Sequence, residues 1–534
     1  MSITSLSFLI FVVFTLLIYY LLPKKLQWIV LLAASGVFYL AGGLKTSFYI
    51  IITSLTVYGA TYLMQRISDN QKKYLKQNKE TLSKDERKAY KNKCQSRRKA
   101  IMICTVIFNF AILCVFKYCH FAVDQINGIL SLFNANQIDN TFNIIIPLGI
   151  SFYTFQSVGY LVDVYWEYFR AEKNYFKVLL FVSFFPQITQ GPISEYQQLS
   201  DELFSEHKFT YRNFTYGVQR FVWGFAKKML VADALNPVVK DTFANYPNYS
   251  GLSTLLGALM YSVQIYADFS GYMDIMCGLC EMLGIRLTEN FERPYFSKSI
   301  AEYWRRWHIT LGVWFKKYVY YPIGTAKKIR KLSKNASDKI SVGFGKNLSA
   351  TIALIVTWLA TGLWHGASWS YIAWGLVNGV FIIVSLWLEP VYKKCKKALR
   401  INESKFSWRA FQTLRTFALV TVIKVLPEVG TLSQGVGLWK HTLLNIFSPV
   451  TFATLIPYLN GVEKGTSIRF LLAVLGTVII FVSSLLQRKK PIRDYFNKIP
   501  MPIRAIIIAG VVILIASFGV QSTWGEGGFM YANF

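Results

Sequence analysis

The sequence predicts an all-α integral membrane protein that crosses the bilayer many times. Hydrophobic residues occupy 53% of its 534 positions, and apolar runs of membrane-spanning length, about 17 to 25 residues, recur along it. Clear runs lie at 6–22, 47–63, 348–364, 470–486 and 505–519. With weaker and interrupted runs included, we predict roughly 11–13 membrane helices.

Basic residues collect in the gaps between the apolar runs, and they account for the net charge of +30. The densest clusters lie at 66–99, 327–339, 393–400 and 488–498. Because positive loops stay on the cytoplasmic side, this pattern predicts extracytoplasmic N- and C-termini. It also predicts anionic membrane lipid, and no nucleic acid, as the partner of these loops. The first run lacks a basic leader and a small-residue cleavage site, so we expect a retained helix.

We expect one membrane domain at 1–490, then a final membrane helix and an extracytoplasmic tail at 491–534. The 66–99 stretch is predicted to form a cytoplasmic helical hairpin or a mobile loop. Cys277 and Cys280 form a C-x-x-C pair, but no second pair or nearby histidine completes a metal set. We therefore predict helix packing for these cysteines and no metal site.

The segment 285–324 is too charged to span lipid and too aromatic for an ordinary loop. It predicts an amphipathic or re-entrant helix that is buried in protein or lines a water-filled cavity. Glu302 and Arg306 are spaced to form an i, i+4 ion pair. Helical spacing puts six large side chains on one face: Trp304, Trp307, His308, Leu311, Trp314 and Phe315.

His365 is the sharpest candidate for chemistry. It lies at the end of an apolar run, between Gly362 and Gly366, in the predicted outer half of its pass. Imidazole accepts a proton near neutral pH, so His365 could act as the general base of an acyl transfer. The residues alone leave open the alternative that it packs and bonds across helices.

His308 is the second candidate, because Arg305 and Arg306 beside it suit a phosphate-rich donor arriving from the cytoplasm. The alternative is an interfacial helix whose arginines snorkel toward water. Asp268 and Asp274 lie in an otherwise apolar helix. A structural hydrogen-bonding role for them is favoured over a proton relay. No nucleotide-hydrolysis or zinc-protease motif is present.

Four motifs, in this order, resemble the membrane-bound O-acyltransferases, particularly the bacterial alginate and peptidoglycan O-acetyltransferase membrane subunits. They are "FFPQITQGPI" (184–193), "YADFSGYMDI" (266–275), "NFERPYFSKSIAEYWRRWHITLGVWFKKYVYYPIG" (290–324) and "TGLWHGASWSYIAWG" (361–375). The resemblance spans about residues 1 to 490, with the specific matches between 147 and 380.

This resemblance implies a ring of membrane helices around a central funnel or tunnel. It implies acetyl-CoA or a similar thioester as the donor substrate, with no permanently bound cofactor. His365 and His308 match the two family histidines. Donor or tunnel contacts would come from Trp304, Arg305, Arg306, Trp307, Asp268 and Trp364.

The chain ends in "GEGGFMYANF" (525–534), which resembles the tail of the small partner protein in D-alanylation systems. Phe529, Tyr531 and Phe534 would form this tail motif, with Tyr531 as acyl carrier and His365 as its base. The alternative is a disordered tail.

The motifs together predict an acetyl transferase of the bacterial cytoplasmic membrane. It would serve an extracytoplasmic acetyltransferase partner and a polysaccharide acceptor of the cell wall or exopolysaccharide. One alternative is a proton-coupled transporter or lipid-linked glycan flippase that uses Asp268, Asp274 and His365. It should show two halves with matching broken helices, and the sequence shows no such repeat. Another alternative is an acyltransferase that acts on lipid or protein hydroxyls.

Overall fold

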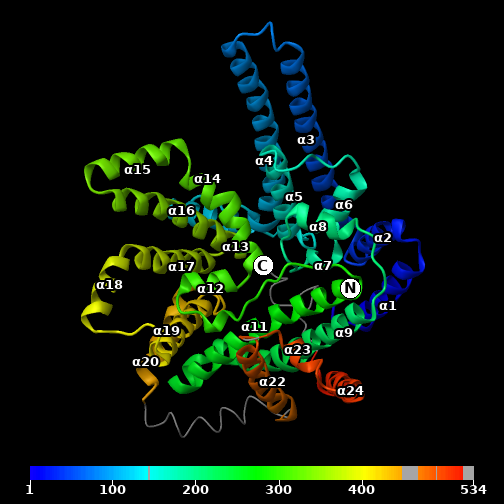
Figure 1. Cartoon of the computed structure of the whole chain (residues 1–534). Helices are drawn as coiled ribbons and strands as arrows, with labels where there is room; N and C mark the ends of the chain where they lie inside the picture. The colour runs from blue at the N-terminus through cyan, green and yellow to red at the C-terminus, as the bar shows by residue number, and fades with distance from the viewer. Residues whose placement is uncertain (142–144, 448–466, 489, 521–534) are drawn as a thin grey trace. The chain divides into compact units, whose positions relative to one another are not determined.

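The computed structural model describes residues 1–141, 145–447, 467–488 and 490–520 (Figure 1). Every regular element in these ranges is a helix, and the one β-type contact among them is an isolated bridge between Phe291 and Trp307. The predicted all-α class is confirmed. The chain divides into two compact units, 1–214 with 280–287 and 215–279 with 288–534. The predicted division at residue 490 stays a prediction.

Six helices in the described ranges are long and apolar enough to cross a membrane. They are α3 (Leu44–Gln77), α4 (Lys84–Leu132), α16 (Val342–His365), α17 (Trp369–Trp387), α22 (Ser467–Leu486) and α24 (Met501–Phe518). The predicted count was higher because it included interrupted runs. It also included the clear run at 6–22, which forms α1 (Leu6–Leu21), a helix of only 16 residues. A polytopic membrane protein is confirmed, and the number of crossings stays a prediction.

In the first unit, α3 and α4 form a long helical hairpin (Figure 1). Ser83 starts α4 with a capping box, in which its hydroxyl accepts from the Glu86 N–H and the Glu86 carboxylate accepts from the Ser83 N–H. The helical alternative for residues 66–99 is therefore confirmed. The remaining helices of this unit are η1 (Lys24–Leu26), α2 (Gln27–Leu40), α5 (Ile150–Tyr165), α6 (Tyr175–Ser183), α7 (Phe185–Ile188) and α8 (Tyr196–Leu203).

The Pro/Gly-broken run at 184–193 is fully buried in the first unit. Its short helix α7 begins with Phe185 and has Pro186 in its first turn. The Gln187 amide group accepts from Gln156 at 2.8 Å and donates to Ser194 at 2.6 Å. Side-chain hydrogen bonds thus satisfy polar groups at a break where lipid could not.

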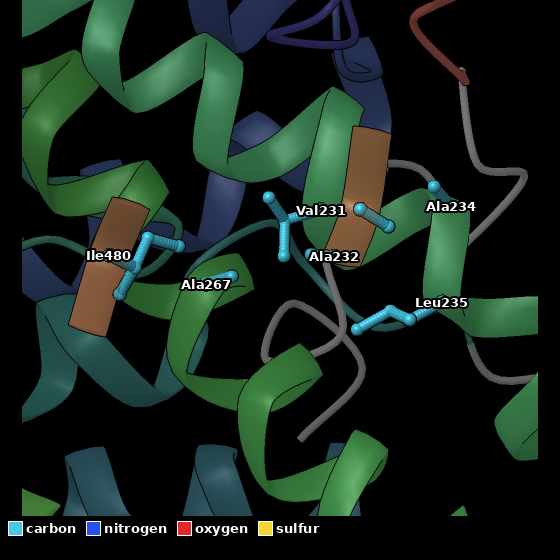
Figure 2. Packing of buried hydrophobic residues seen from close by; sticks show 7 residues of the cluster. Val231, Ala232, Ala234, Leu235, Ala267 and Ile480 are labelled. Atoms are coloured by element: carbon cyan, nitrogen blue, oxygen red, sulfur yellow. The ribbon is translucent and has the colours of Figure 1, made fainter. Parts of the chain in front are cut away.

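The second unit begins with α9 (Tyr211–Phe225), whose first residues belong to the first unit. The π-helix η2 (Ala226–Ala232) and then α10 (Asp233–Ala244) follow it. Small and branched side chains of these elements pack with α11 (Gly251–Met282) and α22 (Figure 2). This cluster is Val231, Ala232, Ala234, Leu235, Ala267, Ala473 and Ile480. It seats η2 against α11, the helix that carries Asp268 and Asp274.

The second unit also contains the following helices, in chain order. They are η3 (Tyr246–Asn248), η4 (Pro294–Phe296), α12 (Ile300–Arg306), α13 (Ile309–Phe315), η5 (Lys316–Tyr320), α14 (Tyr321–Gly324), α15 (Lys327–Lys339), α18 (Glu389–Ala398), α19 (Phe406–Val425), α20 (Leu432–Asn445) and α23 (Ile492–Phe496).

Candidate active site

The aromatic segment 285–324 contains a helix break at His308. α12 ends at Arg306 and α13 starts at Ile309, while His308 takes the left-handed conformation with φ 49°. The prediction of one continuous helical face from Trp304 to Phe315 is therefore wrong. A left-handed histidine is strained relative to helix, so the surrounding structure must hold it in place.

Hydrogen bonds to Asn290 stabilise the left-handed conformation of His308. The Asn290 carbonyl oxygen accepts from the Ile309 N–H at 3.1 Å, and its side-chain oxygen accepts from the Thr310 N–H at 2.9 Å. The Thr310 hydroxyl donates to the same side-chain oxygen at 2.8 Å. These bonds take two N–H groups that the preceding helix would otherwise use, so the chain stops and restarts at His308.

The predicted burial of this segment holds on both sides of the break. The Glu302–Arg306 ion pair forms, with its N and O atoms 2.6 Å apart. The buried members of the predicted face are Trp307, His308, Leu311, Trp314 and Phe315.

His308 lies in an aromatic pocket with 2% of its surface exposed. Its ring centroid is 4.8 Å from that of Phe269 on α11 and 6.1 Å from that of Trp364 on α16. Burial lowers the pKa of His308 to about 3, because the imidazolium would lose its hydration there. His308 lies outside the six candidate membrane helices and is a neutral imidazole at physiological pH.

His365 is the last residue of α16 and is also buried. Its ring centroid lies 4.8 Å from that of Trp364 and 4.7 Å from that of Trp374 on α17. The chain turns at Gly366, and the Ser368 hydroxyl then accepts from the Tyr371 N–H to start α17. The α16–α17 turn thus holds His365 inside the protein. The predicted position in the outer half of the membrane pass stays a prediction.

Glycines let α16 and α17 approach each other at this histidine. A Cβ on Gly362 would lie 2.6 Å from the Tyr371 carbonyl oxygen, and one on Gly375 would lie 2.5 Å from the Trp358 carbonyl oxygen. Both distances are too short for a real contact with backbone. The two helices can therefore pack at this separation only with glycine at these positions.

We expect Gly362→Ala to destabilise the protein by about 1–3 kcal/mol, because its methyl group must push α17 away from α16. The same shift should displace His365 and reduce acyl transfer. Gly343→Ala on the same helix is the matched control, since a Cβ there meets nothing within 4 Å. Thermal unfolding of the two purified variants tests this, and equal stability would show that the helices can separate at little cost.

One indole connects the two histidines. Trp364 lies in ring contact with both His308 and His365. Trp304 packs on the His365 side of this cluster: its ring centroid is 5.4 Å from that of Trp374, and its Nε1–H donates to the Asn378 side-chain oxygen at 3.0 Å. The structure therefore brings together four predicted site residues, His308, His365, Trp304 and Trp364.

The two predicted donor-binding arginines lie differently. Arg305 is exposed, and Arg306 is half-buried in its ion pair with Glu302. Neither belongs to the buried aromatic cluster around the histidines. Their predicted role at the donor stays a prediction.

Asp268 and Asp274 meet basic side chains that sequence reasoning missed. The Lys228 ammonium group donates to Asp268 at 2.7 Å and to Asp233 at 2.8 Å. Lys227 lies 2.5 Å from Asp274, which also accepts from Arg220 at 2.8 Å. The predicted polar partners inside the bundle are thus present.

A π-helix brings the two consecutive lysines to these aspartates. Lys227 and Lys228 both belong to η2, and π-helical bulges are frequent at functional sites. The stretch "GFAKKMLVADAL" (224–235) could have indicated these buried lysines, because two lysines interrupt an apolar run and each needs a polar partner there. Lys424 in "FALVTVIKVL" (417–426) also lies within an apolar run and could have been singled out in the same way.

No group of three or more metal-ligating side chains occurs in the ranges that the structure covers. Phe529, Tyr531 and Phe534 of the predicted tail motif lie outside the described residues.

Comparison with known proteins identifies the family. The family model for the membrane-bound O-acyltransferases matches residues 167–337, which include His308. A probable alginate O-acetylase AlgI of Azotobacter vinelandii is 33% identical over 405 residues, covering 76% of this chain and 70% of the relative. The chain therefore belongs to the membrane-bound O-acyltransferase family, and it is an O-acyltransferase. The resemblance seen in the four motifs is confirmed.

Two further relatives act on other polymers by their names. A peptidoglycan O-acetyltransferase of Helicobacter pylori is 30% identical over 323 residues, covering 56% of this chain and 57% of the relative. A teichoic acid D-alanyltransferase of Bacillus subtilis is 29% identical over 256 residues, covering 48% of this chain and 62% of the relative. The chain thus spans little more than half the length of these two relatives.

Proposed function

We propose that this O-acyltransferase carries acetyl groups from a cytoplasmic thioester, such as acetyl-CoA, toward the hydroxyl groups of an extracytoplasmic polysaccharide. The names of the relatives support a glycan acceptor, since they include alginate and peptidoglycan O-acetylating proteins. The protein would lie in the bacterial cytoplasmic membrane with both termini outside, as its basic loops predict. A separate extracytoplasmic acetyltransferase would then complete the modification.

The observation that carries this proposal is the pair of buried histidines in contact with one indole. His365 acts as the general base: it takes the proton of the acceptor hydroxyl as the oxygen attacks the thioester carbonyl. The carbon–oxygen bond forms, the carbon–sulfur bond breaks, and the leaving thiolate takes up a proton.

His308 is a poor base, because burial lowers its pKa to about 3 and makes the protonated form costly. A neutral imidazole in an aromatic pocket suits it to orient the donor by hydrogen bonding. The cytoplasmic end of this path would bind the charged part of the donor through the exposed Arg305 and its neighbour Arg306. Trp307 and Trp364 would line the path between the two sides.

Base-releasable acetate in the cell-wall polymer fraction tests the proposal. Cells that make the intact protein with its partner should contain acetate that is absent when either gene is deleted. Acetate that does not depend on the protein, despite normal insertion in the membrane, would contradict polymer O-acetylation.

Tyr531→Phe separates two routes for the acetyl group. If Tyr531 carries the group as an ester, this variant should abolish polymer acetylation, because phenylalanine has no hydroxyl to acylate. The measurement is base-releasable acetate at matched membrane levels of protein, with Tyr495→Phe as a control far from the tail in sequence. Normal acetylation in Tyr531→Phe would mean that the group passes directly to a partner.

A further inference from the structure

Lys424 lies in a cage of aromatic rings beside the His308 break. It is the penultimate residue of α19 and is 5% exposed. Its ammonium nitrogen lies 3.6 Å from the centroid of the Trp307 ring, 4.8 Å from that of Tyr295 and 5.2 Å from that of Tyr303. Ring faces attract a cation at such distances, most strongly where water is excluded.

One hydrogen bond completes the cage. Lys424 donates to the Tyr295 hydroxyl at 2.9 Å, and that hydroxyl in turn donates to the Ser262 carbonyl oxygen of α11. Within the ranges that the structure covers, no carboxylate lies within ion-pair distance of Lys424. Burial lowers the pKa of Lys424 well below its usual value, so the ring faces and the Tyr295 hydroxyl are the groups that compensate its cationic form. A lysine buried without an acid contributes little net stability, which leaves room for a role other than stability.

The cage holds the residue that precedes His308. Trp307 stacks on Tyr303, with ring centroids 5.6 Å apart and planes 22° apart, and packs edge-on against Phe291 at 5.0 Å. Lys424 covers the Trp307 ring as well, so the indole has contacts on several sides. A fixed indole restricts the backbone at its neighbour, where the left-handed turn requires outside support.

We propose that Lys424 is a positioning residue for acyl transfer, whose buried ammonium group fixes Trp307 and thereby holds His308 in its left-handed turn. This inference rests on the proposed function, in which His308 orients the donor. Lys424 acts through Trp307 and does not touch the reacting atoms. Misplacement of a positioned group by about 1 Å lowers a rate by about 10²-fold.

Lys424→Met separates this role from a structural one. Methionine keeps the length and apolar character of the stem and removes the buried charge, so the unfolding temperature should stay the same or rise. The turnover rate is measured as thiol release from acetyl-CoA by membranes that hold the full chain, its extracytoplasmic partner and the acceptor polymer. It should fall at least about 10-fold, with the KM for acetyl-CoA nearly unchanged. Lys424→Arg keeps a cation that rests on aromatic rings and should restore most of the rate. Lys405→Met, an exposed residue at the start of the same helix, is the matched control.

Three results would overturn the inference: an unchanged rate in Lys424→Met, a fall in unfolding temperature that parallels the loss of rate, or an arginine variant as slow as the methionine variant. If Lys424→Met does not insert in the membrane, Lys424→Gln is judged by the same criteria. His365→Ala is measured in the same assay. An active His365→Ala variant would contradict the proposed function itself, whereas an inactive one beside an active Lys424→Met variant would contradict only the role of Lys424.

Discussion

His365→Ala is expected to lower acetyl transfer by about 10²- to 10⁴-fold, the usual contribution of a general base. The imidazole is the proton acceptor of the proposed reaction, and none of the rings that surround it, Trp364, Tyr371 and Trp374, accepts a proton near neutral pH. The effect should appear in the turnover rate, since the base acts in the transition state and not in donor binding. Thiol release from acetyl-CoA and base-releasable polymer acetate both report it.

His441→Ala is the matched control for this prediction. His441 lies on α20, where its Nε2 forms a hydrogen bond with the Tyr249 carbonyl oxygen at 2.8 Å. In the described part of the chain, no ring contact joins His441 to either site histidine. Its removal should leave the rate within about 3-fold of normal, as expected for a residue outside the site. A His365→Ala enzyme that is as active as His441→Ala would mean that another group accepts the proton.

Lys228→Ala is expected to destabilise the protein by about 3–5 kcal/mol. Its ammonium group lies between two carboxylates, Asp233 and Asp268, and all three side chains are almost fully buried. Removing the cation leaves two negative charges close together in a medium of low dielectric constant, and each resists desolvation. The measurement is the shift of the unfolding midpoint of the purified protein in detergent.

The control for Lys228 removes the whole charge set. Lys228→Met combined with Asp233→Asn and Asp268→Asn takes away the repulsion together with the attraction. Such neutral replacements of buried ion pairs are often tolerated, so the triple variant should recover most of the stability. If the Lys228→Ala variant unfolds at the normal temperature, Lys228 is not the group that compensates the buried negative charges of Asp233 and Asp268.

The class of the protein and the choice of its two candidate histidines could be predicted from the amino-acid sequence. Long apolar runs leave few alternatives to membrane helices, because a backbone in lipid must satisfy its own hydrogen bonds. A histidine at the end of such a run is costly and therefore stands out. Local spacing was also sufficient for the Glu302–Arg306 pair and for the helical hairpin at residues 66–99, since both depend on contacts near in sequence.

The positions of the helix breaks and the pairing of the buried charges depend on contacts between distant parts of the chain, so the sequence could not predict them. Helical periodicity continues across Trp307 and His308, yet Asn290, a residue outside that helix, takes the N–H groups of Ile309 and Thr310 and ends it. Lys228 meets Asp268 across 40 positions, and Lys424 meets Tyr295 across 129. Such contacts depend on the folded path of the chain. Local propensity acts over a few residues, so it could indicate that these side chains need partners but could not say which partners they find.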